Sequence, residues 1–366
     1  MSPHRRRLLA LLAGAPAWGA AAGDDDPVVA GRTLRFPRDH GAHPGARIEW
    51  WYATGWLQGS GGAEGLLGFQ LTFFRSRTDV AADLPGRFAP RQLLFAHAAV
   101  TDVAARRHDH AQRIARWSGD EALPDGHATR ADTRLALGRW TLVRHAATGA
   151  YAATLPAPDA GIALDLQLAP TQPLLLQGDG GFSRKGPSPQ QASHYYTQPQ
   201  LAVRGRLRPG GPVLDGRGWL DHEWSDELLA PGAVGWDWIG INLADGGALT
   251  AFQLRRADGS VVWAGGSHRP AGGAVRSFTP DEVAFTPQRR WASPATGASY
   301  PVEWAIRTPG GRFTLRALLD AQELDSRASA GTVYWEGLAE LLAPGGARAG
   351  LGYLEMTGRA QALRLG

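Results

Sequence analysis

The chain has 366 residues, of which 38 are Lys or Arg and 34 are Asp or Glu, so its formal net charge is +4. It has no cysteine, which excludes disulfide bonds and thiolate metal sites, and its length is sufficient for two domains. Lys185 is the only lysine and no extended basic cluster follows position 7, so we do not expect nucleic acid as a partner.

The N-terminus has the pattern of a secretory signal peptide. Arginines at positions 5–7 precede an apolar run at 8–17, and three alanines at 20–22 precede an abruptly polar stretch. The apolar run is shorter than the roughly 20 residues that a membrane-spanning helix needs. We therefore predict a signal peptide over residues 1–22, cleaved after Ala22, and a periplasmic or secreted protein that does not span the membrane.

The rest of the sequence predicts strands and turns, since it holds 48 Gly and 25 Pro and no sustained apolar stripe of helical period. Alternating apolar residues at 48–57 and 66–74 flank a glycine-rich turn, which predicts a hairpin. The looser stretch 176–193, rich in Gly, Pro, Ser and Gln, predicts a long loop of the kind that often borders a functional site. Further strands of this first series are expected at 93–101, 140–144, 151–155, 162–168, 201–207 and 216–224.

A second series of strands begins near residue 235, after Pro231 and Gly232 interrupt the pattern. Its members are expected at 235–243, 249–255, 261–264, 302–307, 312–318, 333–341 and 349–356. We predict an all-β fold with two lipocalin-like antiparallel β-barrel domains, over residues 27–228 and 232–366. Barrels of roughly eight strands can each enclose one small ligand. A pair of β-sandwiches has the same sequence signature.

Two short motifs combine carboxylates with tryptophans. Strand alternation places Glu49 and Trp51 on one face and Trp50 on the other. A carboxylate beside indoles on an inward face is partly desolvated, which raises its pKa and makes it a candidate proton donor. The alternative is a glutamate that points to solvent beside one core tryptophan. The second motif, 218–224, places His222 and Trp224 on one face and Asp221 and Glu223 on the other, where the carboxylates could instead pair with arginines.

Two further positions complete the candidate residues. Trp236, Asp237 and Trp238 repeat the pattern of a carboxylate between indoles, with Asp237 pointing away from both if the strand is regular. His97 shares a face with Phe95, which is more typical of a satisfied core histidine than of a catalyst. The histidines are otherwise scattered, and His-Asp-His at 108–110 is expected in a solvated polar turn, so we predict neither a metal nor a cofactor.

Six motifs in order resemble the carotenoid 1,2-hydratase family, and in particular its exported, lipocalin-like AttH-like branch. They are 48–52, 95–97, 195–197, 218–224, 236–238 and 352–358. The resemblance implies two lipocalin-like domains that hold a hydrophobic, isoprenoid or lipid-like small molecule between or within them.

The resemblance also implies a chemistry. An acid protonates a terminal alkene, aromatic faces stabilise the resulting cation, and a base positions the water that adds to it. His222 and Trp224 match the family's His-x-Trp pair. The family's aspartic acid aligns at or near the position of Gln253. The side-chain amide of glutamine cannot donate a proton as an acid. We therefore expect hydration to be lost or the acid to be replaced by Asp237, Asp221 or Glu49.

We expect these residues to converge on one cavity at the domain junction, because pockets form preferentially at domain interfaces. The candidate catalytic residues are Glu49, Asp221, His222, Trp224 and Asp237. The candidate ligand-binding residues are Trp50, Trp51, His97, Tyr195, Trp236, Trp238 and Gln253. Two functions fit: a hydro-lyase that adds water to an alkene, or a non-catalytic periplasmic carrier or accessory of an ABC-type export system.

Overall fold

The computed structural model of the chain describes residues 27–59, 65–78, 91–122 and 126–363. The predicted signal peptide and its cleavage site lie outside these residues. Within the described ranges, no helix has the length and apolar character that crossing a membrane requires.

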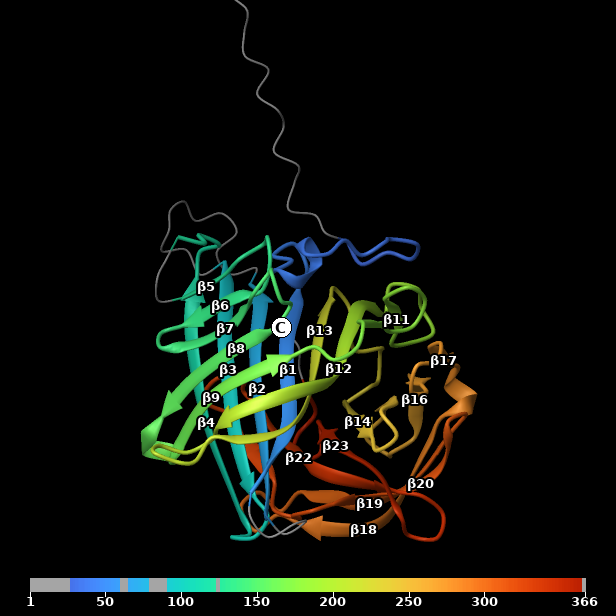
Figure 1. The fold of residues 1–366 in the computed structure, drawn as a ribbon. Helices are drawn as coiled ribbons and strands as arrows, with labels where there is room; N and C mark the ends of the chain where they lie inside the picture. The colour runs from blue at the N-terminus through green and yellow to red at the C-terminus, as the bar shows by residue number, and fades with distance from the viewer. Residues whose placement is uncertain (1–26, 60–64, 79–90, 123–125, 364–366) are drawn as a thin grey trace, which may run out of the picture.

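The described residues form two antiparallel sheets, of thirteen and ten strands (Figure 1). The first has the order β4-β3-β2-β1-β13-β12-β9-β8-β7-β6-β5, with β10 and β11 paired to β12. Its strands are β1 (Ile48–Gln58), β2 (Leu66–Arg77), β3 (Gln92–Asp102), β4 (Arg107–Trp117), β5 (Gly126–Ala128), β6 (Arg134–Leu137), β7 (Trp140–Arg144), β8 (Tyr151–Ala157), β9 (Ile162–Ala169), β10 (Leu175–Leu176), β11 (Phe182–Arg184), β12 (Ala192–Arg206) and β13 (Leu214–Ser225).

The second sheet begins ten residues after β13 ends and has the order β17-β16-β15-β14-β23-β22-β20-β19-β18, with β21 paired to β22. Its strands are β14 (Gly235–Leu243), β15 (Ala248–Arg255), β16 (Val261–Arg269), β17 (Arg276–Phe278), β18 (Ala284–Ala292), β19 (Ser299–Thr308), β20 (Gly311–Ala317), β21 (Glu323–Asp325), β22 (Val333–Leu342) and β23 (Arg348–Met356). Among the described residues, the short 3-10 helices η1 (Arg38–His40), η3 (Pro158–Ala160) and η4 (Pro280–Glu282) lie in the connections.

The first sheet is a nearly closed barrel. Its outermost strand β4 returns to contact β5 and β6 at the other end of the strand order. Strand β9 shows why the sheet curls around a core, because its alternate residues, beginning at Ile162, are buried while those between are more exposed. The interior holds Trp51, Trp117 and Trp140 among aliphatic side chains. The all-β class and the two antiparallel sheets are thus confirmed.

Two local predictions were wrong. Residues 108–110 lie on β4 and not in a polar turn, because the strand pairs with β3 along its whole length. The stretch 176–193 is not one long loop, since β10 and β11 both pair with β12. Its glycines and prolines mark the short turns between these pieces of strand.

The two sheets pack against each other through aromatic side chains. Tyr52 and Trp219 of the first sheet meet Trp238, Phe252 and Tyr353 of the second in one buried cluster. Strand β13 records this contact in its burial pattern: its first residues alternate, whereas its last eight are buried on both faces. One face of β13 therefore belongs to the barrel core and the other to the joint between the sheets.

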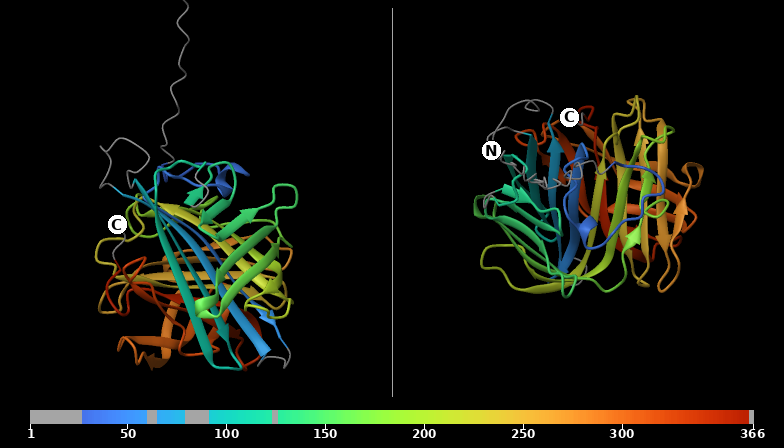
Figure 2. Two further views of the ribbon diagram at one scale, coloured as in Figure 1. Left: turned by 90° about the vertical axis from the view of Figure 1, so that its left-hand side faces the viewer. Right: turned by 90° about the horizontal axis from the view of Figure 1, so that it is seen from above.

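The N-terminal segment, residues 27–47, lies across one end of the barrel (Figures 1 and 2, blue). It includes η1, and its side chains Asp39 and His43 are buried. The carbonyl oxygen of His40 accepts hydrogen bonds from Trp51 Nε1 at 3.1 Å and Thr133 Oγ1 at 2.8 Å. The segment is thus fastened to the interior of the barrel.

Candidate active site

The register of β1 and β13 divides the predicted site residues between two faces. Directly opposed residues of an antiparallel pair share a face, and neighbours along a strand alternate. The opposed pairs are Glu49 with Trp224, Trp50 with Glu223, Trp51 with His222, and Tyr52 with Asp221. The first and third pairs enter the barrel, and the second and fourth line the joint with the second sheet.

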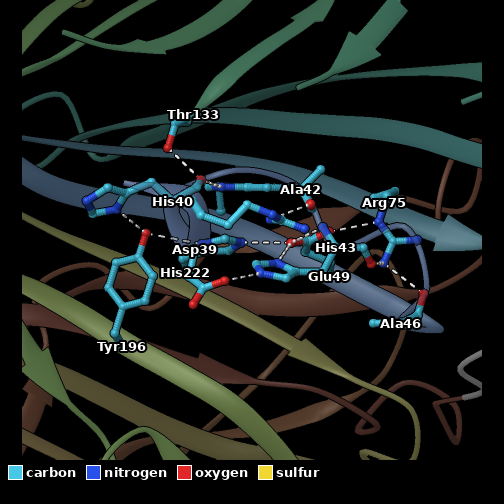
Figure 3. Close-up of polar contacts among 12 residues, drawn as sticks. Asp39, His40, Ala42, His43, Ala46, Glu49, Arg75, Thr133, Tyr196 and His222 are labelled. Atoms are coloured by element: carbon cyan, nitrogen blue, oxygen red, sulfur yellow. Dashed lines mark hydrogen bonds and ion pairs between the residues drawn. The ribbon is translucent and has the colours of Figure 1, made fainter. Parts of the chain in front are cut away.

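Inside the barrel, Glu49 is the centre of a fully buried polar cluster (Figure 3). Its Oε1 lies 2.8 Å from His43 Nδ1 and 2.9 Å from His222 Nε2. Its Oε2 accepts a hydrogen bond from Arg75 Nε at 2.8 Å. Burial raises the pKa of Glu49, but Arg75 and His43 more than offset this and hold the pKa well below its usual range. Glu49 is therefore a paired carboxylate and not a proton donor.

The histidines of this cluster are also fully engaged. His43 Nε2 lies 3.0 Å from Asp39 Oδ1, and the imidazole stacks on Trp224 with ring centroids 3.6 Å apart. His222 Nδ1 lies 3.1 Å from the Tyr196 hydroxyl, and burial lowers the pKa of His222 to about 4. The imidazole of His222 is therefore neutral at physiological pH.

The same cluster contains residue types that can bind a metal ion. His43, Glu49 and His222 offer ligand atoms that lie within 4.8 Å of one another. However, both ring nitrogens of each histidine already face an oxygen, and the second carboxylate oxygen of Glu49 is paired with Arg75. Because no lone pair is left to point at a common centre, these residues do not fit a metal ion. They join the N-terminal segment to β1, β2 and β13.

A cavity lies elsewhere, between the two sheets. It has a volume of about 280 Å³. Its wall is mainly aromatic, with side chains from both sheets, namely Trp50, Phe74, Phe95, Trp236, Trp238 and Phe252. Four carboxyl groups, Asp221, Glu223, Glu336 and Glu355, interrupt this apolar wall. A few polar groups in an apolar cavity are typical of a small-molecule site.

Asp221 is held by three donors on the first sheet. It accepts hydrogen bonds from Tyr195 Oη at 2.8 Å, Thr197 Oγ1 at 2.6 Å and Trp219 Nε1 at 2.9 Å. Burial nevertheless raises the pKa of Asp221 to about 7, with Glu223 adding to the rise. A carboxyl group with this pKa can take or give a proton near neutral pH.

Glu223, by contrast, has a cationic partner. Lys185 Nζ lies 2.8 Å from Glu223 Oε1, and Ser193 Oγ donates to the same oxygen at 2.5 Å. The ammonium group also lies 4.2 Å from the centre of the Phe252 ring and 4.8 Å from that of Tyr195. The sole lysine of the chain therefore forms part of the cavity wall.

Glu336 and Glu355 face each other across β22 and β23, where they are directly opposed. Burial raises the pKa of Glu355 to about 8. Burial and then the neighbouring Glu355 raise the pKa of Glu336 well above its usual range. Oε1 of Glu336 is buried without a hydrogen-bond partner among the described residues. Two close carboxyl groups in an apolar site cannot both ionise readily, so this pair holds a proton at neutral pH.

Neither member of this pair was among the site residues predicted from the sequence. Glu355 lies in the motif 352–358, but nothing set it apart from the apolar residues around it. Glu336 stands between Trp335 and Gly337 in a mostly apolar strand that also contains Glu340. This is the same signal that drew attention to Glu49, a carboxylate next to indole in a strand, and it would have identified Glu336 as well.

Asp237 faces the interior of the second sheet and not the cavity. It accepts a hydrogen bond from Gln253 Nε2 at 2.9 Å and forms ion pairs with Arg255 at 3.3 Å and Arg359 at 2.6 Å. Ile239, two residues further along the same strand face, belongs to the core of the second sheet. Pairing with arginine, considered above for such carboxylates, accounts for the burial of Asp237.

The predicted convergence on one cavity does not hold. Of the candidates, Trp50, His97, Tyr195, Asp221, Trp236 and Trp238 line the cavity. Glu49, Trp51, His222 and Trp224 lie in the barrel, and Asp237 and Gln253 lie in the second sheet. The reason is alternation: adjacent residues of a strand point to opposite faces, so a dense motif is divided between two compartments.

Solved structures with this architecture are known. The crystal structure of an AttH candidate from Nitrosomonas europaea matches with a TM-score of 0.81 and 47% identity, over 91% of this chain and 99% of that chain. Kievitone hydratase from Nectria haematococca matches with a TM-score of 0.65 and 13% identity, over 89% and 93%. CghA with bound Sch210972 matches with a TM-score of 0.52 and 14% identity, over 88% and 90%.

The last two likenesses concern the fold alone, because their sequence identity is low. No curated protein is significantly similar to this chain in sequence. The family model described as AttH-like matches residues 27–359, which is nearly the whole of the described chain. Together with the 47% identity to the Nitrosomonas protein, this match shows that the chain belongs to the AttH-like family.

Proposed function

We propose that the protein binds a hydrophobic, unsaturated small molecule in the cavity between the sheets and adds water to one of its double bonds. The observation that carries the proposal is the pair of Glu336 and Glu355, whose raised pKa values keep a proton inside an aromatic cavity. The fold shared with kievitone hydratase supports it. A proton donor among aromatic faces is what acid-catalysed hydration needs.

The proposed step begins at the protonated carboxyl pair. Glu336 or Glu355 gives its proton to one alkene carbon, and the π electrons form the new C–H bond. The other carbon becomes a cation, which the negative faces of Trp50, Trp236 and Trp238 stabilise. Water then forms the C–O bond and passes its extra proton to Asp221, whose pKa of about 7 suits a general base. Exchange with solvent restores both groups.

A second candidate function is transport without turnover. His222 and Trp224, the pair that the family resemblance assigned to catalysis, are enclosed in the barrel and do not line the cavity. In that case the protein is a carrier, exported to the periplasm, that delivers its ligand to an ABC-type export system. The carboxyl groups would then hydrogen-bond an oxygen of the ligand.

One experiment separates the two functions. Lipids extracted from protein purified from its host identify the ligand by mass spectrometry, and geraniol and farnesol serve as alkene probes. Incubation in heavy-oxygen water should place the label in the product if the protein is a hydratase.

Glu336→Gln should reduce turnover about 100-fold or more while the ligand still binds. The matched control is Asp215→Asn, an exposed carboxylate of β13 paired with Arg204. A bound lipid that the wild-type protein leaves unchanged would establish the carrier.

A further inference from the structure

A line of hydrogen-bonded side chains leads from the turn before β22 to Tyr334, which shares a strand face with Glu336. His97 on β3 of the first sheet reaches across the joint, with Nδ1 2.7 Å from the Tyr334 hydroxyl and Nε2 2.9 Å from Ser329 Oγ. Tyr334 and Glu336 are two residues apart on β22 and therefore share a face. All four line the cavity. None of these contacts has a part in the proposed hydration step so far.

The donor and acceptor of each hydrogen bond in this line follow from the orientation of Gln112, at the end farthest from Glu336. Gln112 Nε2 donates to the carbonyl oxygen of Asp325 at 2.9 Å, which settles the orientation of the amide. Its Oε1 then faces Ser329 Oγ at 2.5 Å, and a carbonyl oxygen can only accept. The single hydroxyl hydrogen of Ser329 is therefore given to Gln112, and Ser329 accepts a hydrogen from His97.

The tautomer of His97 determines the next hydrogen bond, with Tyr334. His97 is fully buried, and burial lowers its pKa to about 3, so its imidazole is neutral and carries one hydrogen. That hydrogen is on Nε2, because Ser329 has none to give. Nδ1 is then an acceptor, and the Tyr334 hydroxyl donates its only hydrogen to it. The Tyr334 hydroxyl therefore has no hydrogen left for Glu336 and presents only its oxygen lone pairs to that carboxyl group.

This arrangement also excludes another interpretation. A serine 2.9 Å from a histidine has the spacing of a nucleophile and its general base. A general base would have to accept the hydroxyl hydrogen, and the hydrogen of Ser329 is directed to Gln112 instead. The pair is therefore not arranged for acyl transfer.

We propose that His97 is a positioning residue: by taking the hydroxyl hydrogen of Tyr334, it denies that donor to Glu336 and keeps this carboxyl group in its protonated form. A carboxylate next to lone pairs is repelled, whereas a carboxylic acid can donate its own hydrogen to them. The inference rests on the proposed function, in which Glu336 or Glu355 supplies the proton. On this inference, His97 lies on the opposite sheet and maintains the surroundings in which the carboxyl pair keeps its proton.

Tyr334 is one of two hydroxyl groups that lie against Glu336, and the other is that of Tyr52. Among the described residues, no arginine or lysine forms an ion pair with Glu336, and Lys185 is paired with Glu223. The titratable groups that influence Glu336 or its partner Glu355 are Tyr52 of β1, Asp221 and Glu223 of β13, Tyr334 of β22, and Tyr353 and Glu355 of β23. The Tyr52 hydroxyl has no other hydrogen-bond partner among the described residues, so it remains available to Glu336 whatever residue stands at position 97.

The test is an infrared titration of the intact protein without ligand. The C=O stretch of a protonated buried carboxyl group is followed against pH, and Glu336→Gln identifies the band of Glu336. His97→Phe should release the Tyr334 hydroxyl to the carboxylate and lower the midpoint of that band by about one pH unit. His97→Asn, whose Oδ1 can accept in place of Nδ1, should restore it. In a Tyr334→Phe background, His97→Phe should have no effect.

The outcomes separate this inference from the proposed function. A midpoint that His97→Phe leaves in place, or moves equally in the Tyr334→Phe background, overturns the role of His97, whatever the activity of the protein. A midpoint that shifts as expected in a protein that never hydrates an alkene probe supports the role of His97 and rejects hydration. Far-ultraviolet circular dichroism confirms that each variant is folded, and His97→Asn provides a folded comparison if His97→Phe is not.

Discussion

Glu355 ties the stability of the protein to pH through its raised pKa. Burial brings the pKa from an ordinary value of 4.5 to about 8 in the folded state. A carboxyl group whose pKa is raised by folding contributes stability that is complete below the unfolded value and is lost as pH rises through the folded one. The loss approaches about 1.4 kcal/mol per pH unit inside that window.

Glu355→Gln should therefore flatten the pH dependence of stability. Its free energy of unfolding should decline less than that of the wild type between pH 5 and pH 9, because the amide does not ionise. Urea unfolding at several pH values measures this, with Asp215→Asn as the control. Parallel curves for Glu355→Gln and the wild type would contradict the assigned environment.

Arg75 is expected to matter because, within the described ranges, it is the arginine that pairs with Glu49. Arg75→Leu should destabilise the protein by about 3–5 kcal/mol, since it leaves a buried carboxylate without its cation. The double variant with Glu49→Gln should recover part of the loss. Urea unfolding provides the measurement, and a double variant no more stable than Arg75→Leu would show that the charge is not the cause.

Individual residues also show where sequence reasoning reached its limit. The division of Glu49 and Trp51 from Trp50 was predictable, because it follows from strand alternation alone. The partners Arg75 and His43 were not, since their approach depends on how β2 and the N-terminal segment pack. Nor could local sequence show that Asp221 faces a second sheet and not solvent.

At the scale of elements, β1 and β13 are the strands on which both compartments depend. Each contributes alternate residues to the barrel core and to the joint, so neither face is exposed to solvent at the site. The hairpin at the first glycine turn and most of the later strands were predictable from period-2 patterns. Strand β4 was missed because its residues are half-buried and polar, which hides the pattern.

Gly240 on β14 is required by the contact between the sheets. A Cβ at this position would lie 2.3 Å from the Trp238 side chain and 2.9 Å from that of Trp219. Gly240→Ala should destabilise the protein by about 1–3 kcal/mol and weaken ligand binding, because Trp238 must move. Gly126→Ala is the control, since a Cβ there meets nothing within 4 Å. Equal stability of the two variants would show that the joint is not tightly packed.

The whole molecule should be most stable near pH 6.5 to 7. Burial lowers the pKa of His40, His97 and His108 to about 3 and of His194 and His222 to about 4, from an ordinary value of 6.5. A base whose pKa is lowered by folding loses its contribution as pH falls from 6.5 through the folded value. These five histidines therefore reduce the free energy of unfolding as pH falls. The cavity carboxyl groups, whose pKa values are raised, reduce it as pH rises.

We therefore expect the free energy of unfolding to fall on both sides of this maximum and more steeply towards acid. Urea unfolding from pH 4 to pH 9 tests the shape of the curve. A protein that gains stability steadily as pH falls from 7 to 4 would contradict the neutral, buried state of these histidines.

Export remains a prediction from the N-terminal sequence. Cleavage after Ala22 should yield a chain that begins at Gly23, four residues before the first described residue. Sequencing of the N-terminus of periplasmic material tests this directly. Soluble cytoplasmic protein that retains Met1 would refute it.

The contacts between the N-terminal segment and the barrel also set an order of assembly during synthesis. Glu49 meets His222 over a separation of 173 residues, and His40 meets Tyr196 over 156. Arg75 and His43 can reach Glu49 early, but its contact with His222 and that of His40 with Tyr196 form only after β12 and β13 are made. The barrel is therefore completed only after β13 has been synthesised.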